Sequence, residues 1–161
     1  MRPEFYADEC RRYATVMQNV SRDVELYACG SDGMKYDWTH GTVPNIDDKT
    51  TGFAMHYYCG RAGDPLTFTN EEWNAMMVQA NRMEEIILRN WSIICAHGRA
   101  HNLKLIVDEW GCWHPDGSGP SKGYNLFEQQ STLRDAMVSA LTLNIFNRHC
   151  DKVRMANAAQ L

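Results

Sequence analysis

The stretch "LKLIVDEWGCWH", residues 103–114, ends an apolar run with two adjacent acids and places two tryptophans beside them. Residues 105–107 are wholly apolar, which is the pattern of a strand covered on both faces in a parallel sheet. Asp108 and Glu109 follow at once, so they are predicted at the carboxyl end of that strand. A carboxylate there must be hydrogen-bonded or used, because burying an unpaired charge is costly.

Helical and extended patterns alternate along the whole chain. The clearest helix is predicted over residues 70–97, where Thr69 and Glu72 fit a capping box and Gly98 follows the last turn. Alternation of this kind is typical of a parallel sheet covered by helices. The other predicted helices cover residues 2–20 and about 128–149, and the predicted strands cover residues 24–30, 51–58, 103–108 and 152–161.

Two α/β architectures fit this alternation, an open doubly wound sheet and a closed (β/α)8 barrel. No G-x-G-x-x-G loop follows a predicted strand, which weakens a nucleotide-binding open sheet. Polar and aromatic residues instead follow the strands, as at the rim of a barrel enzyme. A barrel needs eight strands and typically ~250 residues. The 161 residues therefore predict a partial (β/α)8 TIM barrel of about four βα units, forming one domain over residues 1–161. The residues at the predicted strand ends are Ser31, Asp32, His56, Tyr58, Glu109, Trp113 and Gln160.

Composition excludes several classes of protein. The formal net charge is −4 with acids and bases interspersed, so no basic stripe suggests a nucleic-acid partner. No apolar run approaches the ~18 residues that span a bilayer, and the opening "MRPEFYADECRR" lacks the apolar stretch of a signal peptide. We therefore expect a cytoplasmic protein without a membrane partner.

Metal and cofactor binding are not expected either. The six cysteines include no C-x-x-C pair, and we interpret them as buried thiols in a reducing compartment rather than disulfides or metal ligands. His97 and His101 have the spacing of a helical metal pair, but Gly98 lies between them where the helix should end.

The chemistry of the strand ends points to a carbohydrate site. Glu109 lies between apolar residues and the tryptophans Trp110 and Trp113, whose flat faces suit the C–H faces of a sugar ring. The structural alternatives for Glu109 are a helix N-cap or a salt bridge to Arg134 or Lys122. We favour a catalytic carboxylate.

The neighbouring predicted strand supplies possible partners for Glu109. In "MHYY", residues 55–58, His56 and Tyr58 are two apart and should share one face of the strand. A tyrosine hydroxyl can donate to a carboxylate and hold it ionised, although an interior aromatic at a sheet edge is an equal alternative. Asp32 follows another strand, but its glycine-flanked loop favours a solvated turn residue over an acid–base role.

Four segments together resemble glycoside hydrolase family 51, the α-L-arabinofuranosidases. They match in order across essentially the whole chain. The resemblance implies the second half of the catalytic (β/α)8 barrel, with the first half and the accompanying β-sandwich lying outside this chain. The segments are "RPEFYADECRRYATVMQNV", "MHYY", "VDEWGCWH" and "EQQSTLRDAMVSALTLNIFNRHCDKVRMANAAQL".

The resemblance also implies roles for individual residues. Glu109 would be the nucleophile of a retaining mechanism, with Tyr58 and His56 holding it. Trp113 and Gln160 would contact the sugar. The acid/base of the family is a Glu in an Asn-Glu pair, which would lie upstream of Met1. The chain alone is therefore expected to be inactive, and no cofactor is implied.

The expected substrate is an arabinose-containing oligosaccharide or polysaccharide of the arabinan or arabinoxylan type. The resemblance further implies a homo-oligomer for the full-length protein. Two other functions stay open from the sequence: a related barrel glycosidase acting on β-1,4-glucan or xylan, and a non-catalytic carbohydrate-binding fragment.

Overall fold

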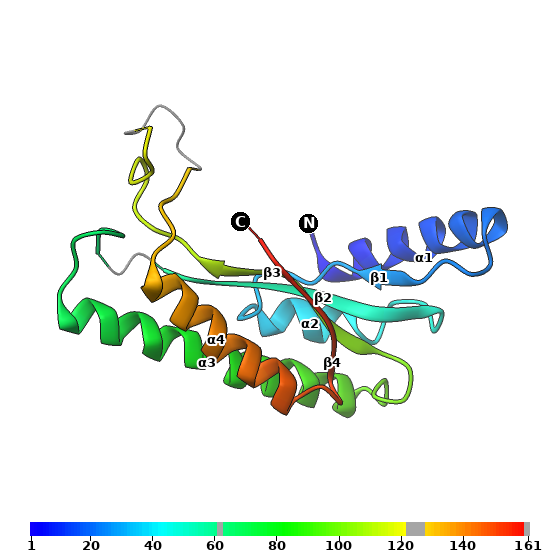
Figure 1. The fold of residues 1–161 in the computed structure, drawn as a ribbon. Helices are drawn as coiled ribbons and strands as arrows, with labels where there is room; N and C mark the ends of the chain where they lie inside the picture. Colours follow the sequence, from blue (N-terminus) through cyan, green and yellow to red (C-terminus); the bar gives the residue numbers. More distant parts are fainter. Residues whose placement is uncertain (61–62, 122–127, 160–161) are drawn as a thin grey trace.

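Four parallel strands form one sheet in the order β1-β2-β3-β4, so strands that follow one another in the chain are also neighbours in space. A computed structural model describes residues 1–60, 63–121 and 128–159 (Figure 1). The strictly sequential order is that of a barrel wall, whereas a doubly wound sheet reverses direction at a switch point. The predicted α/β partial barrel is confirmed. The strands are β1 (Leu26–Ala28), β2 (Thr50–Cys59), β3 (Lys104–Cys112) and β4 (Val153–Ala158).

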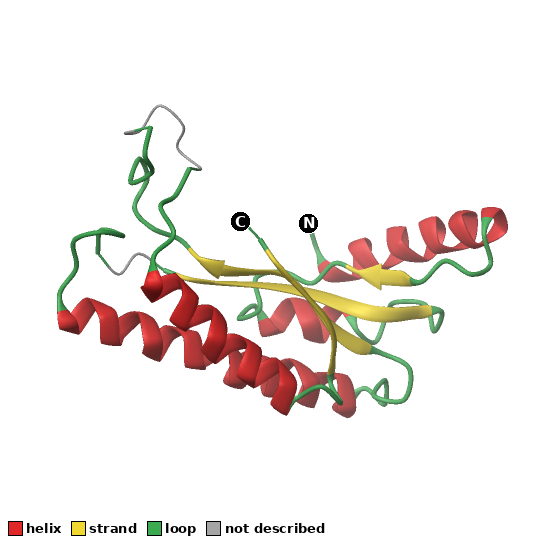
Figure 2. Ribbon diagram, viewed as in Figure 1, coloured by secondary structure: helices red, strands yellow, loops and turns green. Residues whose placement is uncertain are grey.

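Helices alternate with the strands along the chain. The two long helices α3 and α4 lie side by side along one face of the sheet, as Figure 2 shows, and α1 packs against α2 through the rings of Tyr6 and Trp38, 5.3 Å apart. This single helical layer against a parallel sheet matches the outer wall of a barrel. The helices are α1 (Pro3–Val20), α2 (Tyr36–Thr42), α3 (Asn70–Ala96) and α4 (Leu133–Arg148).

The alternation of side chains along β2 separates the core from the candidate site. Phe53, Met55 and Tyr57 are buried in the core on the helical side. His56 and Tyr58 alternate with these core residues along the strand and point to the opposite face of the sheet, where both are only partly buried. The sequence prediction that these two residues share a face is therefore confirmed.

An extra residue in β3 breaks the same alternation. Ala54 is paired with Ile106, but His56 is paired with Glu109, so β3 carries one more residue than β2 across this interval. Val107 and Trp110 both lie in the core. The two residues between them, Asp108 and Glu109, are consequently both displaced from the helical layer, as a β-bulge allows.

Trp110 is therefore not a sugar-facing residue, and this part of the sequence interpretation was wrong. Its side chain is 4% exposed and meets the ring of Phe146 of α4 edge-to-face, at 5.2 Å between centroids. The strand also continues to Cys112, beyond the predicted end at residue 108, because Cys112 still pairs with Cys59 of β2. Glu109 thus lies within the strand.

The element boundaries differ from the predictions mainly at α4. This helix begins at Leu133 rather than near Glu128, because Asp135 accepts from the backbone N–H of Thr132 and fixes the first turn there. The predicted capping box of Thr69 and Glu72 is present at α3. The strands β1 and β4 are shorter than predicted, and residues 160–161 lie outside the described part of the chain.

The two outer strands are linked across the helix-free side of the sheet. Arg154 of β4 forms an ion pair with Glu25, the residue before β1, and Glu25 also accepts from the hydroxyl of Tyr27. Among the described residues, no further strand pairs with the outer edge of β1 or of β4. The contact between the ends of a four-stranded sheet shows that the sheet is curled.

A buried asparagine joins the β1–α2 connection to α3. Asn90 is 1% exposed; its carbonyl accepts from the hydroxyl of Thr39, and its amide donates to the backbone oxygens of Gly33 and Ile86. Gly33 in turn donates to the backbone oxygen of His56. Asn90 thereby supports the segment beside the candidate site.

Replacing Asn90 with alanine should lower the free energy of unfolding by about 3 kcal/mol, because Thr39 and Gly33 would keep buried polar groups without partners. Urea unfolding monitored by circular dichroism measures this. Asn81→Ala, at an exposed position of the same helix, is the matched control. Equal stability of the two variants would contradict the assigned role of the Asn90 network.

Candidate active site

Tyr58, His56 and Glu109 meet on the helix-free face of the sheet. The hydroxyl of Tyr58 donates to Oε2 of Glu109 at 3.0 Å, and Nδ1 of His56 lies 3.4 Å from the same oxygen. The side chain of Glu109 is 46% exposed, so its carboxylate can be reached from solvent. Three residues that were predicted from the sequence are therefore in direct contact.

Asp108 completes this group, although the sequence analysis did not single it out. Its Oδ1 atom lies 3.2 Å from Nε2 of His56, so the imidazole stands between two carboxylates. The contact lacks the alignment of a hydrogen bond. Regular alternation would have placed Asp108 and Glu109 on opposite faces. Only the extra residue in β3 brings both carboxylates to His56.

The electrostatics of the site keep Tyr58 protonated. Burial, the hydrogen bond to Glu109 and the charges of Glu109 and Asp108 together raise the pKa of Tyr58 to about 12. The neighbouring Tyr57, on the opposite face, also has a pKa raised to about 12, there chiefly by burial. At neutral pH the phenol of Tyr58 therefore remains a hydrogen-bond donor to Glu109.

Trp113 forms an aromatic wall beside this cluster. Its ring centroid lies 5.6 Å from that of Tyr58, and its backbone N–H donates to the carbonyl of Cys59 at 2.9 Å. Of the five predicted site residues, Glu109, Tyr58, His56 and Trp113 are brought together. The fifth, Gln160, lies outside the described residues.

The segment after β3 is anchored by residues that the sequence analysis missed. In Figure 1 this segment (yellow) extends away from the sheet before the chain returns to α4. The side chain of Gln129 accepts from the backbone N–H of His114 at 2.6 Å, and Nε2 of His114 lies 2.7 Å from Asp135. These contacts join an irregular segment to a helix end, so no periodic pattern of residues predicts them.

The structure also describes the surroundings of Asp32 and of Arg134, one of the two cations considered as partners of Glu109. The carboxylate of Asp32 accepts from the backbone N–H of Met34 at 3.0 Å, as expected of a turn residue. Arg134 is fully buried, with its guanidinium 4.1 Å from the centre of the Phe68 ring. Lys122, the other cation considered for Glu109, lies outside the described residues.

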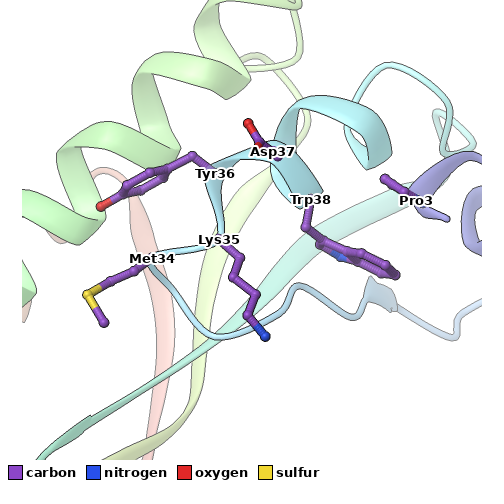
Figure 3. A pocket seen from close by; sticks show the side chains of 6 residues that line it. All are labelled: Pro3, Met34, Lys35, Tyr36, Asp37 and Trp38. Carbon is purple, nitrogen blue, oxygen red and sulfur yellow. The ribbon is translucent and has the colours of Figure 1, made fainter. Parts of the chain in front are cut away.

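A separate open pocket of about 530 Å³ lies at the start of α2. Figure 3 shows Lys35 and Trp38 pointing to one side of this turn and Met34 and Tyr36 to the other. The indole nitrogen of Trp38 donates to the carbonyl of Cys29 at 3.2 Å. This pocket does not include the cluster around Glu109. The residues that line the pocket are Pro3, Met34, Lys35, Tyr36, Asp37 and Trp38.

The described residues form neither a metal site nor a membrane-spanning helix. Within residues 1–60, 63–121 and 128–159, no group of three or more His, Cys, Asp or Glu side chains could hold a metal ion. Helix α3 ends at Ala96, and Gly98 has a φ of 69°, so His97 and His101 do not share a helix. No helix in these ranges has the length and apolar character to cross a bilayer.

Comparison with known proteins gives one consistent result. Residues 108–161 match the family model of the α-L-arabinofuranosidase C-terminal domain. The chain is 32% identical to an intracellular exo-α-L-arabinofuranosidase of Bacteroides ovatus, covering 100% of this chain and 32% of that protein. It is 27% identical to an intracellular exo-α-(1→5)-L-arabinofuranosidase of Streptomyces lividans, covering 98% of this chain and 25% of that protein.

Solved structures agree with the sequence relatives. The GH51 arabinofuranosidase of Xanthomonas axonopodis pv. citri superposes with a TM-score of 0.89 at 33% identity, covering 100% of this chain and 34% of that one. A family 51 α-L-arabinofuranosidase of Bifidobacterium longum gives a TM-score of 0.80 at 25% identity, with the same coverage of this chain and 34% of its own. The chain spans about a third or less of the length of these relatives.

Replacing Glu109 with glutamine should lower the pKa of Tyr58 from about 12, because the charge that opposes ionisation of the phenol is removed while burial remains. Tyr57 is an internal control and should stay near 12. Titration by ¹³C-tyrosine NMR, assigned with Tyr58→Phe, measures both. An unchanged Tyr58 titration would contradict the electrostatic coupling.

Asp135 should contribute a pH-dependent part of the stability. Burial alone would raise its pKa, but hydrogen bonds from His114 and Thr132 outweigh burial and lower the pKa to about 2. A carboxyl whose pKa is lower in the folded than in the unfolded chain stabilises the fold above pH ~4 and loses that effect as the pH falls towards 2.

Asp135→Asn should therefore cost about 2 kcal/mol at pH 7 and progressively less below pH ~4. Denaturant unfolding at a series of pH values measures the difference from the unmodified chain. Asp37→Asn, at an exposed position of α2, is the control. A cost that does not change with pH would show that Asp135 acts without its charge.

Proposed function

Because this chain is a barrel fragment of the glycoside hydrolase family 51 α-L-arabinofuranosidases, we propose that Glu109 is the nucleophile of a retaining glycosidase. The observation that carries this proposal is the solvent-accessible carboxylate of Glu109, which is contacted by Tyr58 and His56 on the helix-free face of the sheet. Residues 1–161 then act as a single partial barrel domain.

In the proposed first step, a carboxylate oxygen of Glu109 attacks the anomeric carbon of an arabinofuranosyl unit. A new C–O ester bond forms as the bond to the leaving oxygen breaks, and that oxygen takes a proton from a general acid. Tyr58 and His56 both contact Oε2, so we assign the attack to Oε1. Water then releases the sugar from the covalent intermediate.

Tyr58 and His56 would serve to hold the carboxylate of Glu109 in place for attack. The phenol donates to the carboxylate and remains protonated at neutral pH, since its pKa is about 12. Asp108, on the far side of His56, would hold the imidazole beside Glu109. The arrangement needs no metal, because two carboxyl groups and water complete this chemistry.

Besides the nucleophile, the retaining mechanism requires a second carboxyl group as the general acid. A retaining enzyme needs its two carboxyls ~5–5.5 Å apart, one of them protonated. The other acid that contacts this cluster in the described residues is Asp108, whose Oδ1 lies 3.2 Å from Nε2 of His56. We therefore propose that the general acid belongs to the part of the barrel that relatives have and this chain does not, and that the chain alone does not turn over natural substrate.

The proposed substrate is a terminal α-L-arabinofuranosyl residue of an arabinan or arabinoxylan-type chain. The names of the Bacteroides and Streptomyces relatives describe exo-acting arabinofuranosidases, which motivates this choice. Trp113 would form a wall of the sugar pocket, and Gln160 would contact the sugar. The same relatives are named intracellular, so we propose a cytoplasmic protein, homo-oligomeric at full length.

An activated substrate tests the nucleophile without the missing acid. A 2,4-dinitrophenyl α-L-arabinofuranoside carries a leaving group that departs without protonation. The chain should release up to one equivalent of dinitrophenolate and retain one arabinofuranosyl group on Glu109, detected by peptide mass spectrometry. Glu109→Gln should reduce labelling by at least about 10³-fold.

The controls separate the proposed function from its alternatives. Glu85→Gln, on α3 and away from the site, should label like the unmodified chain. The corresponding β-glucoside and β-xyloside should not label, and labelling by either would favour the glucan or xylan alternative. Absence of any burst, or attachment at another residue, would refute Glu109 as the nucleophile.

A further inference from the structure

The side chain of Gln129 joins the backbone on both sides of Trp113. We propose that Gln129, His114 and Asp135 form a clamp that positions Trp113 against Tyr58 and thereby sets the aromatic wall of the candidate site. These are positioning residues that act through Trp113. The proposal rests on the proposed function only in treating that wall as a sugar-binding surface.

The primary amide of Gln129 is suited to this task because it accepts and donates at once. Its Oε1 accepts from the N–H of His114 at 2.6 Å, and its Nε2 donates to the carbonyl of Cys112 at 3.3 Å. Only Trp113 lies between these two backbone groups, and its own N–H donates to Cys59 of β2. Three hydrogen bonds therefore fix the backbone from which the indole projects.

His114 ties this backbone to the helical layer. Its side chain is 1% exposed, and its Nε2 lies 2.7 Å from Oδ1 of Asp135, the third residue of α4. The Nδ1 atom is buried and has no hydrogen-bond partner in the described part of the chain. The proton is therefore best placed on Nε2, where a carboxylate accepts it, and the ring orientation is fixed.

Asp135 is itself held firmly. Its other oxygen, Oδ2, accepts from both the backbone N–H and the hydroxyl of Thr132 at 2.8 Å. The amino-terminal turn of α4 thus anchors His114, and His114 together with Gln129 anchors the residue between β3 and the following loop. The contacts run from α4 to Trp113, from Trp113 to Tyr58, and from Tyr58 to Glu109.

Because these contacts run from α4 through Trp113 and Tyr58 to Glu109, loss of the clamp should change the site. Loss of a contact that only anchors the loop should not. If the clamp positions Trp113, removing it should move the indole relative to Tyr58 and weaken sugar binding while the fold persists. If the clamp only stabilises the loop, its removal should lower stability and leave the indole and the sugar affinity unchanged.

The test compares Gln129→Ala with Gln130→Ala. Gln130 is the matched control, since it is the next residue and its amide donates to the carbonyl of Ser131. Two signals are measured by NMR in the intact chain: the nuclear Overhauser effects between Trp113 and Tyr58, and the indole N–H resonance of Trp113, assigned with Trp113→Phe. Binding is measured by titration with methyl α-L-arabinofuranoside.

Gln129→Ala should lose the Trp113–Tyr58 contacts, shift the indole resonance and weaken the sugar affinity about tenfold, as the loss of an ordered aromatic wall implies. Gln130→Ala should match the unmodified chain in all three. Should Gln129→Ala fail to fold, Gln129→Asn replaces it, because its shorter side chain cannot span both backbone groups.

Two outcomes separate the clamp from the proposed function. Unchanged Trp113–Tyr58 contacts and an unchanged indole resonance in the Gln129 variant would overturn the clamp, whether or not the sugar affinity changes. If the unmodified chain binds no arabinofuranoside, the sugar-binding role of the wall fails, and the position of Trp113 still decides whether the clamp exists.

Discussion

The arrangement of the site depends on one extra residue in β3. Without it, Asp108 and Glu109 would point to opposite faces of the sheet, and one carboxylate would be buried against α4 without a partner. With it, Val107 and Trp110 both remain in the core while the two acids face His56. Bulges of this kind occur next to active sites, where they redirect a side chain.

The sequence was sufficient for those features that follow a regular period. Alternation in β2 placed His56 and Tyr58 on one face, and the apolar run before Glu109 placed that residue at the carboxyl end of the adjacent strand, although β3 in fact continues to Cys112. The capping box of α3 was predicted from Thr69 and Glu72. Regular spacing carries this information because each side chain's direction depends only on its position in the element.

The features that the sequence did not reveal all involve a break in that regularity. Trp110 was assigned to the sugar side and Asp108 was given no role at the site, because a bulge shifts the alternation and leaves no mark in the residue pattern. The start of α4 was placed too early, since Gln129 makes contacts with the backbone of Cys112 and His114, at and just beyond the end of β3, instead of joining the helix. Long-range partners of this sort require coordinates.

The ion pair between Arg154 and Glu25 bears on how this sheet would pair with the strands that complete a barrel. It joins the two ends of the four-stranded sheet within these 161 residues, but both of its side chains are nearly half exposed, so solvent screens the contact and it favours the curl only weakly. The curl of these four strands can therefore still adjust to the strands of a complementary wall.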